Sequence, residues 1–300
     1  MILRYSCSAI SAQLEKTNKT LVSEVDFSIE SGKSLALIGE TGSGKTMIAQ
    51  AVMRLLPSNV SVAGETALFC GKPLPTARKM KRLLGVDIVY IPQNGLEFLD
   101  PSRTIRKQLY DNLKKIGLPS RELECASIEK LLGAGLHDAK ALLDKYSFQL
   151  SGGMAQRVAI ALAACSAARL VIADEPTNGL DFEIRLNFQE LLSQMFPNAA
   201  RLVITHDIAI AETCDDVLVL CRGKMMERGA VSQVLSSPRH PYTQVLLDSQ
   251  VKRGMRESPV LRDGAGECPF YRRCDRASDA CLTERKYHNE NGTEWWCCHT

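Results

Sequence analysis

The stretch that decides the fold runs from Leu35 to Gln50 and reads LALIGETGSGKTMIAQ. Its first four residues are apolar, a run long enough for a buried strand and too short for a helix. The glycines that follow allow a turn in which backbone N–H groups point inward, because no Cβ blocks the approach of a phosphate. A helical pattern then continues to Leu56 and is stopped by Pro57. Strand, glycine turn and helix in this order predict a site for nucleotide phosphates.

The turn has the P-loop spacing: a glycine, four residues, and then Gly-Lys-Thr. We expect backbone amides and the positive end of the helix to hold the phosphates, Lys45 to reach the terminal ones, and the Thr46 hydroxyl to ligate Mg²⁺. The alternative is a chance glycine turn before a core helix, and the strand and helix on either side argue against it. The expected nucleotide-binding residues of this loop are Gly39, Glu40, Thr41, Gly42, Ser43, Gly44, Lys45 and Thr46.

Length and composition predict a large globular core. The chain has 300 residues, 45% hydrophobic and 24% charged, which suits one domain of about 200 to 250 residues plus a smaller part. A formal net charge of +3 is too small to predict binding to nucleic acid or to an anionic membrane. The start lacks the pattern of a secretory signal, and the best apolar stretch, Val158 to Ala173, is interrupted by Arg169 and is shorter than the ~20 residues of a membrane span. If the protein works at a membrane, partners must hold it there.

Two adjacent carboxylates follow a second apolar strand, which starts at Leu170. Successive side chains point to opposite faces of a strand, so the two acids at its end are expected to have different roles. Asp174 can support Mg²⁺ beside Thr46, and Glu175 can polarise an attacking water. A solvated turn before the next proline is an equal alternative for the pair alone, and the P-loop upstream favours the catalytic interpretation.

A second glycine pair precedes a helix of small residues. Ser151 suits a helix N-cap, but Gly152 and Gly153 are unfavourable at a helix start unless something must approach the backbone. A second phosphate-binding helix N-terminus would explain why two unfavourable glycines stand there. One chain cannot easily bring both helix N-termini to one nucleotide, so we expect two chains to face each other. Gln93 and His206 each follow a predicted strand and are candidates to reach the metal, the water or the γ-phosphate. A lone Gln or His in a loop is usually only surface.

The order of these motifs resembles that of an ABC-type ATPase. The similarity covers about residues 1–248, as one copy of the module, and includes the Walker A, Q-loop, signature, Walker B, D-loop and H-switch motifs, here Gly39 to Thr46, Gln93, Leu150 to Met154, Leu170 to Glu175, Asn178 to Asp181 and His206. It implies an α/β P-loop ATPase with a mostly parallel sheet core, an antiparallel β subdomain and a helical subdomain at about 94–150. Residues 249–300 form a cysteine-rich extension.

The same resemblance implies ATP and Mg²⁺ as ligands and a head-to-tail dimer. The loop of one subunit and Ser151, Gly152 and Gly153 of the other would enclose each ATP. Only Asn94 to Leu150 separates Q-loop and signature, too short for the coiled coil of DNA-repair relatives, and a single module excludes the tandem translation type. A transporter subunit remains, with its membrane spans on separate chains, as in importers.

The implied partners are therefore a second ATPase subunit, more readily a different one than a second copy, and two permeases, with an extracytoplasmic binding protein acting indirectly. The protein would lie on the cytoplasmic face of the membrane and bind no nucleic acid. Two alternatives stay open: a soluble regulatory ATPase without permeases, and a metal sensor in which the tail is the active part. Co-purifying integral subunits would argue against the first, and loss of function on deleting the tail but not in Lys45→Ala would support the second.

Two positions depart from the usual motifs. Met154 ends the signature where Gln is usual, a form similar to that of nickel-transport ATPases. The amino-terminal aromatic that stacks on adenine in this family is not evident, since Tyr5 is the one candidate and lies early.

The tail narrows the subgroup and carries a cysteine cluster. Six cysteines are scattered over the first 221 residues, as expected in a reducing cytosol, and five lie from Cys268 to Cys298. The segment Arg239 to Thr243 and the tail resemble those of peptide and nickel importer ATPases, and this implies a [4Fe-4S] cluster on Cys268, Cys274, Cys281 and Cys298. Cys298 is preferred to Cys297 because it precedes His299. Zn²⁺, or reduced thiols without a ligand, are the alternatives. The cargo, whether peptide, nickel or a metal chelate, is not readable from this chain.

Overall fold

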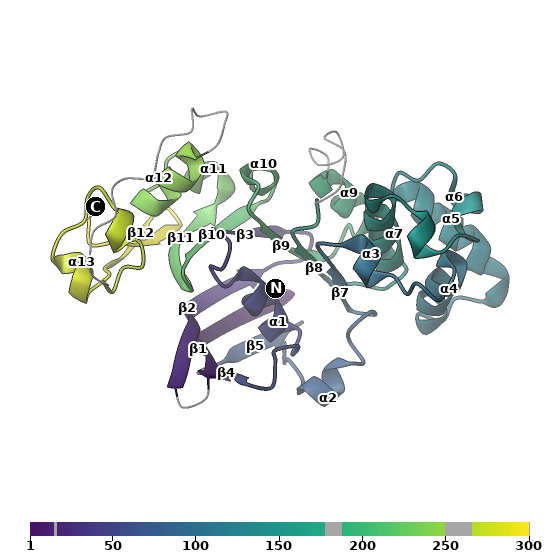
Figure 1. The fold of residues 1–300 in the computed structure, drawn as a ribbon, viewed down its shortest axis with the longest axis horizontal. Helices are drawn as coiled ribbons and strands as arrows, with labels where there is room; N and C mark the ends of the chain where they lie inside the picture. Colours follow the sequence, from purple (N-terminus) through teal and green to yellow (C-terminus); the bar gives the residue numbers. More distant parts are fainter. Residues whose placement is uncertain (15–16, 178–187, 250–265, 300) are drawn as a thin grey trace. The chain divides into compact units, whose positions relative to one another are not determined.

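The computed structural model describes residues 1–14, 17–177, 188–249 and 266–299, in two compact units (Figure 1). The first unit comprises Met1–Leu3, Ser28–Ser34 and Leu68–Ile204. The second comprises Arg4–Phe27, Leu35–Ala67 and Thr205–Thr300. Each unit contains its own part of the predicted motifs, so each is described by itself.

The second unit is built on a sheet with the strand order β1-β2-β11-β10-β3. Strands β3 and β10 are parallel, and β10 and β11 form an antiparallel hairpin, which the sequence predicts from residues 217–221 and 224–227. All five residues of β3 are buried, as its apolar sequence predicts. The strands are β1 (Leu3–Leu14), β2 (Thr17–Ile29), β3 (Ser34–Ile38), β10 (Asp216–Cys221) and β11 (Lys224–Ala230).

Helix α1 (Lys45–Val52) follows the glycine turn but ends before the predicted Leu56. Arg54 adopts a left-handed conformation with φ 59° and forms an ion pair with Glu65. That conformation stops the helix before Pro57, so the prediction of its end was wrong. This unit also contains α10 (Ile208–Ala211), α11 (Val231–Val234) and α12 (Pro241–Asp248), besides a short helix in the carboxyl-terminal tail.

The sequence predicts a strand pair between residues 60 and 75, with turns at Gly64 and at Gly71 to Pro73, but the strands pair differently. Strand β4 (Val60–Ala63) lies antiparallel to β1, with Ala9 opposite Ala63. Strand β5 (Thr66–Phe69) pairs instead with the short β6 (Lys72–Pro73), which occupies part of the predicted turn. Pairing with a distant strand leaves no mark in the local pattern, and the sequence therefore suggested the wrong partner.

The first unit has three parallel strands in the order β9-β8-β7. These are β7 (Ile88–Ile91), β8 (Leu170–Asp174) and β9 (Ala200–Thr205), and β8 and β9 are wholly buried. The sequence predicts a strand from Gly85 to Ile91, and β7 is shorter because Gly85 has φ +78° and belongs to a turn. The parallel sheet of the predicted α/β fold is confirmed in this unit.

Most helices of the first unit gather beside these strands, and a short helix at residues 77–80 lies apart from them (Figure 1). Leu109, Leu131, Leu143 and Val158 are wholly buried in their common core. The sequence predicts a helical pattern broken near residues 117–119 and 133–135, and both breaks are confirmed. It also predicts a helix from Phe182 to Met195, which the structure describes only from Phe188 onward. The helices are α2 (Ala77–Met80), α3 (Gly95–Phe98), α4 (Ile105–Lys115), α5 (Leu123–Gly133), α6 (Ala139–Leu142), α7 (Gly152–Ala164) and α9 (Phe188–Met195), with short 3-10 turns at Ser120–Glu122 and Ser147–Gln149.

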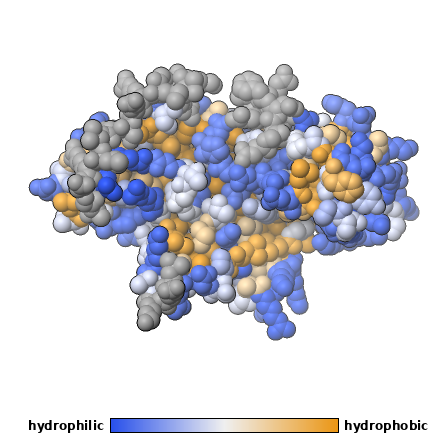
Figure 2. Space-filling model, in the orientation of Figure 1, coloured by the Kyte–Doolittle hydropathy of each residue, from blue (hydrophilic) through white to orange (hydrophobic). Residues whose placement is uncertain are grey.

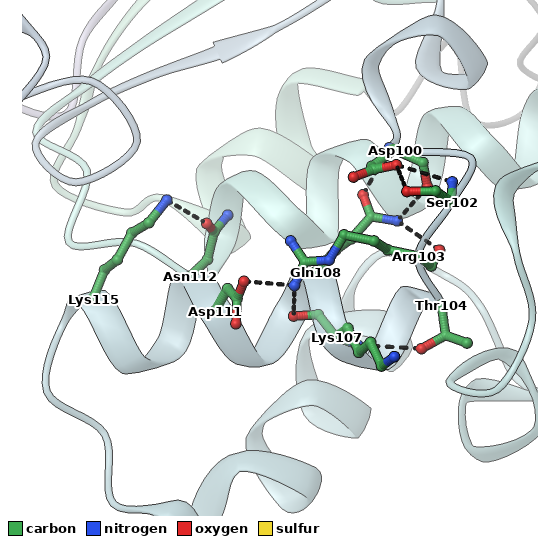
Figure 3. A network of polar contacts seen from close by, with 9 residues as sticks. All are labelled: Asp100, Ser102, Arg103, Thr104, Lys107, Gln108, Asp111, Asn112 and Lys115. Atoms are coloured by element: carbon green, nitrogen blue, oxygen red, sulfur yellow. Dashed lines mark hydrogen bonds and ion pairs between the residues drawn. The ribbon is translucent and has the colours of Figure 1, made fainter.

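A polar network fixes the loop between α3 and α4 (Figure 3). The Gln108 side chain accepts a hydrogen bond from the Asp100 backbone N–H at 3.0 Å and donates to the carbonyls of Asp100 and Arg103 at 3.1 and 3.2 Å. Arg103 also donates to Asp111 at 2.6 Å, and Thr104 caps α4. Since Gln108 is buried, these bonds hold the loop on the helix.

The carboxyl-terminal tail joins the sheet of the second unit. Strand β13 (Thr293–Trp296) pairs antiparallel with β11 and with β12 (Tyr287–Glu290). The ring of Trp295 is buried and stacks on that of His288 at 5.0 Å. Two short elements precede this hairpin, a 3-10 turn at Tyr271–Arg273 and α13 (Ala280–Thr283). Within the described part of the chain, no helix is long and apolar enough to cross a membrane.

The neutral imidazole of His240 caps the start of α12. It is buried, and its Nδ1 accepts a hydrogen bond from the Tyr242 backbone N–H at 3.0 Å. Its own backbone N–H donates to the buried Glu227 carboxylate at 3.0 Å. Burial, and to a lesser degree the charge of Arg285, lowers the pKa of His240 to about 3. The imidazole therefore stays an acceptor at neutral pH.

We expect His240 to make the protein sensitive to acid. The unfolded chain takes up a proton near pH 6.5 and the folded chain does not, so the stabilisation from His240 is complete above pH ~6.5 and is lost as the pH falls toward about 3. His240→Asn keeps a capping acceptor and cannot titrate. Urea unfolding between pH 7 and 5 should show the wild type losing up to about 1.4 kcal/mol per pH unit more than the variant. Parallel losses in both proteins would contradict this role.

Candidate functional site

The phosphate loop is tightly constrained by its glycines. Gly39 has φ +150°, and a Cβ there would lie 2.1 Å from the carbonyl oxygen of Leu220 on β10. Gly44 has φ +101°, and its Cβ would lie 2.6 Å from the side chain of Val22. Since real Cβ atoms cannot approach so closely, both positions require glycine. The sheet thus dictates where the loop begins and where α1 starts.

Lys45 points back into this loop. Its side chain is buried, and Nζ donates to the carbonyl oxygens of Gly39 at 2.8 Å and of Glu40 at 3.1 Å. The Glu40 carbonyl also accepts from the backbone N–H of Ser43 at 3.1 Å. Thr46 lies exposed in the first turn of α1. The ammonium group and the start of the helix therefore lie within one short loop, as the P-loop spacing predicts.

The two carboxylates after β8 differ in environment. Asp174 is buried, and its Oδ2 accepts a hydrogen bond from the Tyr90 hydroxyl at 3.3 Å. Burial, and then the charge of Asp174, raise the pKa of Tyr90, which keeps that hydroxyl a donor. Glu175 is half-buried, has φ +46°, and its backbone N–H donates to the carbonyl of Ile204 at 2.8 Å. A non-glycine residue in this conformation at a strand end is typical of a functional site.

Ser151 caps α7, as its sequence position predicts. Its Oγ accepts a hydrogen bond from the Met154 backbone N–H at 3.3 Å. A Cβ added at Gly152 would meet no atom of the described residues within 4 Å, so packing among these residues does not require glycine there. By contrast, a Cβ at Gly95 in α3 would lie 2.6 Å from the backbone of Ala155. Glycine at position 95 is explained by the close packing of α3 on α7, and glycine at position 152 is not.

A hollow of about 680 Å³ lies beside the exposed Gln93, which follows β7. It is lined by residues of α3 and α7, among them Phe98 and Gly152. Gln156 of α7 donates to the carbonyl of Pro92 at 2.8 Å and so ties α7 to the Gln93 segment. Apolar side chains gather over α3 and α7 on the face drawn in Figure 2, and Leu96 and Phe98 are 38% and 40% exposed.

The predicted residues thus fall into two groups. The first unit brings together the ends of β7 and β8 and the start of α7. The second unit contains the loop from Gly39 to Thr46, and His206, which follows β9, is exposed. The predicted D-loop, Asn178 to Asp181, lies outside the described residues. Sequence reasoning missed Tyr90 and Gln156, although a polar side chain within an otherwise apolar element was the available signal.

The family of the chain follows from comparison with known proteins. A family model described as "ABC transporter" matches residues 22–178, just over half of the chain, and one described as "Oligopeptide/dipeptide transporter, C-terminal region" matches residues 226–281. This chain belongs to the ABC transporter family. It is an ATP-binding, ATP-hydrolysing subunit, and such subunits of importers dimerise and work with membrane permeases.

The relatives of this ABC subunit are similar to it over most of its length. The dipeptide transport ATP-binding protein of Haemophilus influenzae is 31% identical over 301 residues, which cover 95% of this chain and 91% of the relative. The metal-staphylopine import system ATP-binding protein of Staphylococcus aureus is 35% identical over 252 residues, or 82% and 93% of the two chains. A solved dimeric cassette bound to ADP and Pi aligns with TM-score 0.68 over 77% of this chain and 99% of its own, at 20% identity. The last similarity supports the ATPase fold alone.

The suggested adenine-stacking residue of this ABC subunit is not at the surface. Tyr5 is wholly buried and packs against Phe27 with ring centroids 5.8 Å apart. A nucleotide base cannot stack on a side chain enclosed in this way. Tyr5 is a core residue of the β1–β2 part of the sheet.

Four of the five tail cysteines are buried, and Cys297 is one of them. Cys268, Cys274, Cys281 and Cys297 are at most 7% exposed, whereas Cys298 is half-buried and its Sγ donates to the Glu284 carbonyl at 3.0 Å. Burial, and then the charge of Asp275, raises the pKa of Cys274 to about 12. Burial, and then the hydrogen bond with the Cys281 thiol, raises the pKa of Cys298 to about 11. No group of three or more potential ligands stands in a metal-binding arrangement among the residues described.

Two glycine-to-alanine variants test which of the two glycines is required by packing within the chain. Gly95→Ala is expected to destabilise the protein by about 1–3 kcal/mol, because the new methyl group overlaps the α7 backbone. Gly152→Ala is expected to leave stability unchanged or to raise it by up to about 1 kcal/mol, because alanine favours a helix. Thermal unfolding of both variants measures this. A destabilised Gly152→Ala would mean that the chain itself requires this glycine.

Proposed function

We propose that this chain is the ATP-hydrolysing subunit of an importer for dipeptides, oligopeptides or metal complexes, including nickel. The observation that carries the proposal is the presence, in one chain, of a phosphate loop and of a carboxyl-terminal region matching oligopeptide and dipeptide transporters. Relatives named for dipeptide and metal-staphylopine transport support both kinds of cargo. The cargo would be selected by an extracytoplasmic binding protein and by the permeases.

In the proposed mechanism, six side chains of the predicted motifs act on the ATP phosphates. Lys45 neutralises the phosphates, and Thr46 and Asp174 position Mg²⁺, for which their oxygen atoms are suitable ligands. Glu175 orients the attacking water, Gln93 senses the metal and the permease, and His206 holds the γ-phosphate. The buried position of Asp174 and the greater exposure of Glu175 support this division of roles.

The second half of each ATP site would come from a partner. We assign this to Ser151, Gly152 and Gly153 at the start of α7, facing the phosphate loop of another ATPase subunit. The free space around a Cβ at Gly152 supports the assignment, since an approaching phosphate explains a glycine that internal packing does not require. The partner would be a related but different subunit, or else a second copy.

Permease binding would use the α3–α7 surface. The hollow beside Gln93 and the exposed side chains of Leu96 and Phe98 provide an apolar binding surface for a segment of a membrane partner. The network around Gln108 holds the adjoining loop in place, so the surface is preformed. Two integral permeases bound in this way would keep the ATPase at the cytoplasmic face of the membrane.

The tail cysteines would hold a [4Fe-4S] cluster, with Zn²⁺ as the alternative. Thiolates suit either group, and binding would lower the raised pKa values that burial imposes on these thiols. Cys268, Cys274 and Cys281 would be three ligands. The fourth would be Cys298, as first expected, or Cys297, which its burial supports.

Glu175→Gln tests the catalytic assignment. The variant should lose at least about 100-fold in ATP turnover, because an amide cannot act as a base toward water. ATP-dependent dimerisation, followed by size-exclusion chromatography, should remain. Glu190→Gln, an exposed carboxylate on α9, serves as the control and should hydrolyse ATP normally. Unchanged hydrolysis by Glu175→Gln would remove this residue from the mechanism.

Metal analysis tests the tail. Protein purified without oxygen should contain about four irons per chain and absorb broadly near about 400 nm. Of the variants Cys297→Ser and Cys298→Ser, the one that replaces the fourth ligand should lose the metal. One zinc per colourless chain would support the alternative, and neither metal would refute the proposed cluster.

A further inference from the structure

The tail contacts the phosphate loop through one arginine. Arg273 makes a two-pronged ion pair with Glu40, its Nη1 lying 2.7 Å from Oε1 and its Nη2 2.7 Å from Oε2. Arg273 lies in the 3-10 turn just before Cys274, and Glu40 directly follows Gly39. Paired hydrogen bonds between planar groups fix orientation as well as distance, which a single contact between exposed charges does not.

Aromatic side chains hold Arg273 in this position. Its guanidinium group lies over the ring of Phe270, 5.2 Å from the centroid, and Phe270 is 1% exposed. Phe270 in turn packs edge-on against Tyr242 of α12 at 5.3 Å. The Arg273 side chain is only 21% exposed, so the ion pair has a better-fixed partner than a surface arginine would offer.

Tyr242, against which Phe270 packs, also binds the backbone of Glu40. The Tyr242 hydroxyl accepts a hydrogen bond from the Glu40 N–H at 3.0 Å. Glu40 is therefore held by its side chain and by its amide, while its carbonyl oxygen accepts from Lys45 and from the backbone N–H of Ser43. Every polar group of Glu40 has a partner, and these partners link the tail to the lysine of the loop.

We propose that Arg273 is a positioning residue for the phosphate loop. By fixing Glu40 together with Tyr242, it preorganises the carbonyl that orients Lys45, so that less conformational freedom is lost when phosphates bind. The inference rests on the proposed role of the loop in binding ATP. It adds that affinity for ATP depends on the docked tail.

Equilibrium titration of the full chain with a non-hydrolysable ATP analogue and Mg²⁺ tests this. Arg273→Ala should weaken binding about five-fold, Arg273→Lys should recover part of that loss, and Glu40→Gln should resemble Arg273→Ala. The double variant Glu40→Gln/Arg273→Ala should bind no more weakly than either single variant, because both remove the same interaction. Arg276→Ala removes an exposed arginine of the same segment and should bind within two-fold of the wild type, about the error of such a comparison.

Wild-type affinity in Arg273→Ala, or single losses that multiply in the double variant, would overturn the inference. If thermal unfolding shows that Arg273→Ala does not fold, the affinities of Arg273→Lys and Glu40→Gln for the analogue are used instead. Wild-type affinity in both of these variants would then overturn the inference. Lys45→Ala is measured alongside. If Lys45→Ala binds the analogue like the wild type, the phosphate site itself is refuted; if it loses binding while Arg273→Ala does not, only the role of Arg273 fails.

Discussion

The structure depends on one close approach, that of the Gly39 backbone to the Leu220 carbonyl on β10. No side chain fits between them, so the chain leaving β3 must turn there, and Gly44 repeats the constraint beside Val22 at the start of α1. The loop between these two points is short, and the Lys45 side chain points back toward carbonyl oxygens of the same loop. A nucleotide site follows, because oriented amides and a buried ammonium group attract phosphate.

Other parts of the chain contain the remaining candidate groups. Asp174 is fixed by burial and by Tyr90, whereas Glu175 keeps an exposed part and a strained backbone, features that suit a ligand and a base. The start of α7 has a glycine without an internal reason, which favours a site completed by a partner. Attachment of the tail through β13 and Arg273 gives the carboxyl-terminal region a physical link to the loop.

Local patterns predicted those parts of the fold that local forces determine. The buried strands β3 and β8, the cap at Ser151 and the P-loop all follow from spacing and residue type. The end of α1, the pairing of β4 with β1 and that of β13 with β11 depend on partners far away in sequence, which periodicity does not record. Tyr5 illustrates the same limit, since its residue type suited base stacking and its place in the sheet buried it. Likewise, adjacent cysteines at 297 and 298 differ in burial because of how the hairpin folds.

The phosphates, more than the base, are expected to hold the nucleotide in this loop. The most direct measurement is displacement of a fluorescent ATP analogue from the full-length chain by inorganic triphosphate and, separately, by adenosine. We expect triphosphate with Mg²⁺ to displace the analogue and adenosine at the same concentration not to displace it. Displacement by adenosine but not by triphosphate would contradict it.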